Sequence, residues 1–257
     1  MGYKLDIRTG KQPILLKVDV YSPKETEARL TVYDTEHKNT LYIDRDMTIK
    51  GDDTFFLRMP ISPVIARVFS TVQIKKITRE ELPRKFTAFD WNNYTVRSFV
   101  NFIQEFCEKM GYLKTQYKYY SDDRFFEVQY LDILKTDGKK VTTPARINKF
   151  TGVIQVSAER MKPMTVPMRM AILLHEYAHF YKNKDAESEQ ESDMNSLFIY
   201  LGLGYPRYEA YVAWINTFDY STPENEEPYP AHEERLRKIK DIIDNFDEKF
   251  KEISFIK

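Results

Sequence analysis

The chain has 257 residues with 39 basic and 39 acidic side chains, so its formal net charge is zero. Without a basic excess we expect no nucleic-acid partner, and the length allows one large or two modest domains. The single cysteine, Cys107, excludes an internal disulfide and a cysteine-based zinc site. No run approaches membrane-spanning length and the N-terminus has no signal-like apolar core, so we expect no membrane span, no signal peptide, and a location in the cytoplasm or within a larger assembly such as a virion.

Residues 1–82 alternate short strand-like runs with turns. The runs cover residues 14–21, 28–33, 40–44, 54–58 and a longer stretch from 64 to 74. Short strands with period-2 alternation at this spacing predict a small antiparallel β-sandwich. The sandwich carries no residues that indicate chemistry, so we expect it to dock a protein partner or to self-assemble.

A second domain is expected over residues 83–257. Charged residues and Pro83 cluster over 77–84, which predicts a hinge between the two domains. Apolar residues then recur at helical spacing from 95 to 110, which predicts a helix.

The next segments predict a small sheet and further helices. Two strand-like segments, 124–134 and 146–157, flank an Asp-Gly turn at 137–138, which predicts a hairpin-like pair. A long charged helix is expected at about 231–252. The predicted fold is therefore α+β, with an N-terminal antiparallel β-sandwich followed by a mainly helical domain that contains a small sheet.

The sequence His175-Glu176-x-x-His179 lies inside the helical run 166–182. Positions i and i+4 share one face of a helix, so the two imidazoles could bind one zinc ion while Glu176 deprotonates the zinc-bound water. The alternative is a chance match on a surface helix. The flanks are apolar nearly all round, which predicts a buried helix, and buried ionisable groups are costly unless something pairs them. We therefore expect a zinc site.

Such a site needs a third protein ligand, and three glutamates compete for this role in the next predicted helix: Glu187, Glu189 and Glu191. Glu189 begins a stripe at helical spacing that continues with Asp193, Ser196 and Tyr200. The small and polar members of this stripe could face the histidine helix closely, so we predict Glu189 as the ligand. We expect Glu187 and Glu191 to form an exposed acidic helix start.

Two further residues of this helix have predicted roles. Asp193 lies one turn after Glu189 and is placed to accept the free ring N–H of a liganding histidine. Asp185 is a plausible N-cap, because aspartate accepts hydrogen bonds from the first backbone amides of a helix.

The pattern His175-Glu176-x-x-His179 followed by Glu189-x-x-Ser-Asp193 resembles that of the gluzincin metallopeptidases. It is most similar to M48-type peptidases and related minimal gluzincin domains, over roughly residues 145–240. The resemblance implies a zincin-like domain in which His175, His179 and Glu189 bind Zn²⁺ and Glu176 is the catalytic base. It also implies an edge strand along which an extended protein or peptide substrate binds, and residues 152–158 are our candidate.

The end of the family pattern, His-Pro-x-x-x-x-Arg, is altered here. The spacing from Pro230 to Arg235 matches, but Tyr229 stands where the family has histidine, and His232 is shifted by three positions. Tyr229 could donate a hydrogen bond to the oxyanion as a catalytic residue. His232 is a second candidate for substrate or oxyanion contact, with an exposed helix-start histidine as the alternative. Arg235 is expected to form an ion pair near the site.

Two functions from different classes follow. The first is a zinc-dependent metalloendopeptidase that hydrolyses peptide bonds. The second is a structural or assembly protein, for example a phage virion component, that retains a metallopeptidase fold. We favour the enzyme, because a purely structural copy has no evident need for Glu176.

Overall fold

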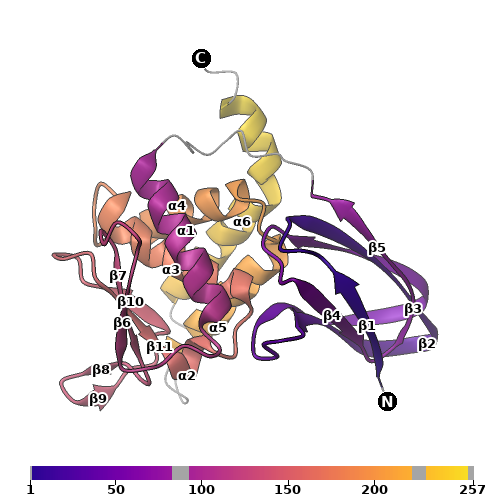
Figure 1. The fold of residues 1–257 in the computed structure, drawn as a ribbon. Helices are drawn as coiled ribbons and strands as arrows, with labels where there is room; N and C mark the ends of the chain where they lie inside the picture. Colours follow the sequence, from indigo (N-terminus) through magenta and orange to yellow (C-terminus); the bar gives the residue numbers. More distant parts are fainter. Residues whose placement is uncertain (1, 83–92, 222–229, 254–257) are drawn as a thin grey trace.

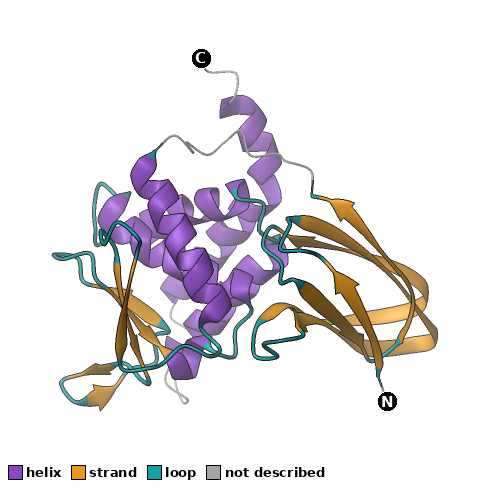
Figure 2. Cartoon of the chain, in the orientation of Figure 1, coloured by secondary structure: helices purple, strands orange, loops and turns teal. Residues whose placement is uncertain are grey.

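The structure is a computed structural model that describes residues 2–82, 93–221 and 230–253. An antiparallel sheet is followed by helices and two smaller sheets (Figure 1 and Figure 2). The predicted α+β class is confirmed.

The N-terminal sheet contains five strands within residues 2–82. They are β1 (Tyr3–Arg8), β2 (Ile14–Asp34), β3 (Leu41–Met59), β4 (Ile65–Ser70) and β5 (Gln73–Glu81). The order is β1-β4-β2-β3, and β5 also pairs with β2. β3 follows one edge of β2, whereas β5 and β4 share the other edge, beside residues 14–21 and 30–34. Alternate side chains of β2 point into the core, as the period-2 pattern predicts.

Two long strands replace four of the predicted short ones. β2 includes both 14–21 and 28–33, and β3 includes 54–58 and all of 40–44 except Thr40. The polar residues between these runs predicted turns, but β2 and β3 stay paired there apart from a register shift between Ser22 and Thr26. The middle of the paired strands β2 and β3 has no third strand beside it, so polar side chains are favourable there. The result is a single curled sheet where the sequence predicted a sandwich (Figure 2).

A hinge was predicted over residues 77–84, and this prediction is wrong for residues 77–81. These residues belong to β5, whose pairing with β2 extends to the partners Glu81 and Ile14. Their charged side chains are mostly exposed on the strand, so they mark its solvated face and not a linker. Residues 83 and 84 lie outside the described residues.

The second region contains a small mixed sheet. Its strands are β6 (Tyr117–Tyr120), β7 (Glu127–Leu131), β10 (Ala145–Ile147) and β11 (Ile154–Ser157), in the order β10-β11-β7-β6. The segments predicted as a hairpin do pair, but β7 and β11 run parallel. The Asp-Gly turn at 137–138 instead closes a separate sheet of β8 (Lys135–Thr136) and β9 (Lys139–Lys140), where both turn residues have positive φ.

Six helices lie in the described part of this region. They are α1 (Tyr94–Lys109), α2 (Ala158–Met161), α3 (Val166–Tyr181), α4 (Glu189–Gly202), α5 (Arg207–Ser221) and α6 (Pro230–Ile253). α3 is the central element and packs against α1, α4, α5 and β10. Thr165 caps its start by accepting a hydrogen bond from the Met168 amide, and Pro167 lies in the first turn. Its apolar flanks are buried nearly all round, as predicted.

The two regions meet in a packed interface. The carboxylate of Glu209 in α5 is fully buried and binds the Arg45 guanidinium of β3 through two hydrogen bonds of 2.9 Å. Arg169 of α3 is also buried, and it donates to backbone carbonyls that include Cys107 of α1 and Asn39 of the β2–β3 loop. The N-terminal sheet is therefore fastened directly to the helix that carries the two histidines.

Candidate metal centre

The Nε2 atoms of the two α3 histidines, His175 and His179, converge on one position. Nε2 of His175 and Nε2 of His179 lie 3.1 Å apart, and their rings are nearly perpendicular. Glu189, at the start of α4, places Oε2 at 3.3 Å from Nε2 of His175 and Oε1 at 3.3 Å from Nε2 of His179. Ligands about 2.0–2.1 Å from a tetrahedral zinc are about 3.3 Å from one another. The three side chains could therefore hold a metal ion.

A hydrogen bond behind the ring of His179 and an ion-pair contact behind the ring of His175 orient the lone pairs. Nδ1 of His179 lies 2.8 Å from the carbonyl of Ala186, which can only accept, so Nδ1 carries the hydrogen. Nδ1 of His175 lies 3.0 Å from Oδ1 of Asp193. In the neutral rings both Nε2 atoms thus present lone pairs towards a carboxylate, an arrangement that requires a cation. This is the fit expected of a metal site.

The shifted pKa values of His175 and Glu189 indicate the same requirement for a cation. Burial works to lower the pKa of His175, but contacts with Asp193 and Glu189 outweigh it and raise the pKa to about 10. Burial works to raise the pKa of Glu189, but its hydrogen bonds to the two histidines lower it. A proton on His175 is therefore the cation that a metal ion would replace.

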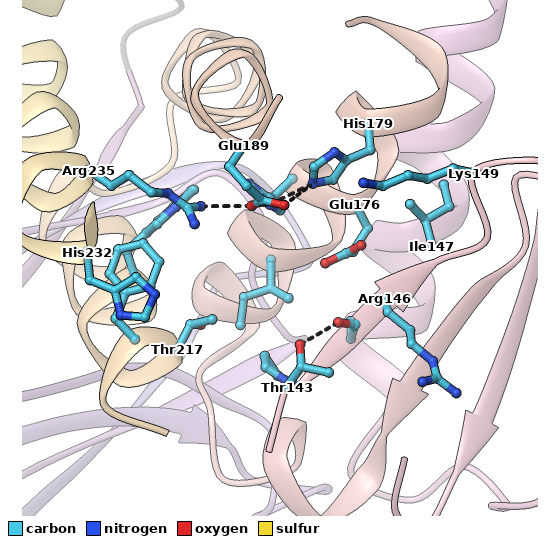
Figure 3. Close-up of a pocket in the computed structure, with 16 residues that line it drawn as sticks. Thr143, Arg146, Ile147, Lys149, Glu176, His179, Glu189, Thr217, His232 and Arg235 are labelled. Carbon is cyan, nitrogen blue, oxygen red and sulfur yellow. Dashed lines mark hydrogen bonds and ion pairs between the residues drawn. The ribbon is translucent and has the colours of Figure 1, made fainter. Parts of the chain in front are cut away.

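Asp193 lies where the sequence predicts, against the ring of His175. It also accepts a hydrogen bond of 2.9 Å from Nε1 of Trp214 and two from Arg235, at 2.8 and 2.9 Å. Arg235 further contacts Oε2 of Glu189 at 3.1 Å, as Figure 3 shows. One arginine thereby fixes both carboxylates, which is the ion-pair role expected for it.

The start of α4 differs from the prediction. The N-cap is Ser188, whose Oγ accepts from the Glu191 amide, and not Asp185. Asp185 instead accepts from the Glu187 amide, and the Glu191 carboxylate accepts from the amides of Lys184 and Asp185. Serine and aspartate cap equally well, so residue type could not distinguish them. Glu191 therefore orders the loop before α4 and is not part of the group formed by His175, His179 and Glu189.

Glu187 is likewise separate from the histidine pair. Its side chain is 78 % exposed and forms an ion pair of 2.7 Å with Lys149. Of the three competing glutamates, the structure brings only Glu189 to the histidines.

Glu176 lies on the same turn as His175 and points into the adjoining cavity (Figure 3). Burial raises the pKa of its carboxyl, against nearby histidines and a hydrogen bond from the backbone of Ile147. A base with a raised pKa, placed beside a metal position, suits proton transfer near neutral pH.

The cavity has a volume of about 360 Å³. β10 and the preceding residues form one wall, α3 and Glu189 form the metal side, and α5 and α6 form the opposite wall. The α5 residues that line it are Trp214, Thr217 and Phe218. Sequence reasoning missed these three, because the segment that forms α5 carries no recognisable motif.

The candidate edge strand is corrected from residues 152–158 to β10. The predicted segment, residues 152–158, contains β11, which lies between β10 and β7 and has no free edge. In β10 the amide of Asn148 and the carbonyl of Pro144 bond to the β11 side. The alternation of an antiparallel pair then turns the backbone groups of Ala145 and Ile147 towards the free edge. Both residues line the cavity.

Two candidates for oxyanion contact have different outcomes. Tyr229 lies outside the described residues. His232 lines the cavity beside Arg235, and its ring stacks on Phe218 with centroids 4.8 Å apart. Burial and the Arg235 charge lower the pKa of His232, which favours the neutral ring. The alternative of an exposed helix-start histidine does not describe it.

Comparisons with models of known protein families, with curated proteins and with solved structures gave no match. Among the described residues, no helix is both long and apolar enough to cross a membrane.

Proposed function

We propose that this protein is a zinc-dependent metallopeptidase that cleaves extended peptide segments, in the manner of the gluzincins. The observation that carries the proposal is the convergence of His175 Nε2, His179 Nε2 and the Glu189 carboxylate at tetrahedral spacing, with Glu176 beside them. His175, His179 and Glu189 would hold the zinc. Bound zinc supplies an acidified water and polarises the scissile carbonyl.

The protein's own residues supply the proton transfers and the alignment. Glu176 takes a proton from the attacking water and delivers it to the leaving amine. The free edge of β10 offers the backbone groups of Ala145 and the carbonyl of Ile147 to an extended substrate, which aligns it along the cavity.

His232 and Arg235 support the reaction from the opposite wall. The neutral ring of His232 can donate one hydrogen bond to the oxyanion that develops opposite Glu176. Arg235 keeps Glu189 and Asp193 ionised and oriented. A purely structural protein would not require the base, the metal ligands and the free strand edge together, so the enzyme is favoured over an assembly component.

The test is metal content together with hydrolysis of an unfolded protein. We expect about one zinc per chain by mass spectrometry, loss of zinc and activity in Glu189→Ala, and retention of both in the matched control Glu191→Ala. The control removes a carboxylate that bonds only to the loop before α4. A folded wild type that takes up no zinc, or that binds zinc without hydrolysing any substrate, would favour the structural alternative.

A further inference from the structure

The carboxylate of Asp193 meets donors from three other helices. Its Oδ1 lies 3.0 Å from Nδ1 of His175 in α3, and it accepts hydrogen bonds of 2.9 Å from Nε1 of Trp214 in α5 and Nη2 of Arg235 in α6. Oδ2 accepts from Nε of Arg235 at 2.8 Å. An ionised carboxylate offers about four lone-pair sites, so these donors fill its capacity. The orientation of Asp193 behind His175 is therefore set by its donors, and one of them comes from Trp214.

Trp214 belongs both to this contact and to the wall of the cavity. Trp214, Thr217 and Phe218 lie at helical spacing on α5, and all three line the cavity. Asp193 is not among the lining residues, and its side chain is only 5 % exposed. The indole of Trp214, together with Arg235, therefore separates the Asp193 carboxylate from the cavity. Away from water, the hydrogen bonds of this carboxylate are electrostatically stronger than they would be in solvent.

The contact between Asp193 and His175 directs the Nε2 lone pair of that histidine. A carboxylate that accepts the hydrogen on Nδ1 leaves Nε2 as the metal ligand and fixes the orientation of the ring. Zinc ligands must lie within about 0.2 Å of their ideal distances, so a turned carboxylate weakens the site. Arg235 divides its hydrogen bonds between Asp193 and Glu189, whereas the single N–H of Trp214 is directed at Asp193. Trp214 is thus the donor that determines the position of Asp193 independently of Glu189.

We propose that Trp214 is a positioning residue for the metal ligand His175: its indole N–H fixes the Asp193 carboxylate, which in turn fixes the imidazole. Loss of this N–H leaves a buried lone pair of Asp193 without its donor, and the carboxylate then turns to satisfy it. The inference rests on the metal site of the proposed function and not on peptide hydrolysis. An indole that only filled space in the core would not need its N–H for metal binding, and this difference can be measured.

The experiment measures zinc affinity by chelator competition in wild type and in Trp214→Phe, which keeps an aromatic ring but removes the N–H. We expect the variant to bind zinc about tenfold more weakly. The visible absorption of the Co²⁺-substituted protein, which reports the geometry of the metal ligands, should also change.

The matched control is Tyr200→Phe. It removes a buried hydroxyl of α4 that donates to the Pro206 carbonyl at 3.0 Å instead of to Asp193. This control should lower the free energy of unfolding of the metal-free protein and keep both the zinc affinity and the Co²⁺ spectrum. A second variant separates packing from hydrogen bonding: benzothienylalanine at position 214 has the shape of tryptophan with sulfur in place of the N–H, and it should reproduce the loss of zinc affinity.

The outcomes separate this inference from the proposed function. An unchanged zinc affinity in both Trp214 variants, with a loss of stability only, overturns the inference and leaves the proposed metal site intact. A zinc affinity that falls in Trp214→Phe but is normal with benzothienylalanine also overturns it, because packing would then be the cause. A folded wild type that takes up neither Zn²⁺ nor Co²⁺ overturns both. Because both readouts report metal binding, a failure to hydrolyse peptides bears on the proposed function alone.

Discussion

Two arginine–carboxylate pairs of similar geometry serve different purposes in the two regions. In the N-terminal sheet, Arg29 binds both oxygens of Asp44 at 2.7 and 2.6 Å, with side chains 55 % and 21 % exposed. Near the candidate metal centre, Arg235 binds both oxygens of Asp193 at 2.8 and 2.9 Å, with side chains 15 % and 5 % exposed. The first pair sits in solvent on a strand face, whereas the second holds a histidine in place.

The comparison shows what burial adds to the same contact. A solvated ion pair contributes little, because water stabilises the separated charges nearly as well. A buried pair has lost that hydration, so removal of one partner leaves an uncompensated charge. The group of His175, Glu176, Asp193 and Arg235 is costly to bury for stability alone, which favours a functional reason for it.

The largest expected effect tests whether the buried cluster performs catalysis. Glu176→Gln removes the base but keeps the shape of the side chain, so hydrolysis should fall by about 10²–10⁴-fold. Zinc should remain bound, because Glu176 is not among the three converging ligands. Peptide hydrolysis and zinc content are measured together, with Glu187→Gln as an exposed control. Unchanged turnover would remove Glu176 as the base.

Neutralising one carboxylate of each pair sharpens the comparison directly. Asp193→Asn should weaken zinc binding by about 10–100-fold, because His175 loses the charge that orients its ring. It should also lower the free energy of unfolding by about 3–5 kcal/mol, whereas Asp44→Asn should cost about 0–1 kcal/mol. Chelator competition measures the affinity, and denaturant unfolding measures the stability. Equal effects of the two substitutions would contradict the distinction drawn from burial.

A smaller effect is expected from pH. Because the pKa of His175 is raised to about 10 when no metal is bound, zinc must displace a proton below that pH. Zinc affinity should therefore rise about tenfold per pH unit from pH 7 to 9. In metal-free protein the imidazolium stabilises the fold fully below pH 6.5, and this contribution is lost as pH rises through about 10. Chelator competition and metal-free unfolding follow the two trends; a zinc affinity independent of pH would contradict the protonated state.

Much of the candidate metal centre could be predicted because its spacing is local. The 3.6-residue period of a helix places His175 and His179 on one face, and it selected Glu189 over its neighbours. The apolar flanks indicated that α3 is buried, and the structure agrees. Helix boundaries such as that of α1 follow the same kind of signal.

The tertiary structure decided the features that depend on contacts between distant segments. The pairing of Arg235 with Asp193 crosses 42 residues, and that of Arg45 with Glu209 crosses 164. No local period specifies such contacts. Strand order is similar: the same apolar run suits an interior or an edge strand, so only packing could place β10 and not β11 at the free edge. Sequence determined which side chains share a face, and tertiary packing determined which faces meet.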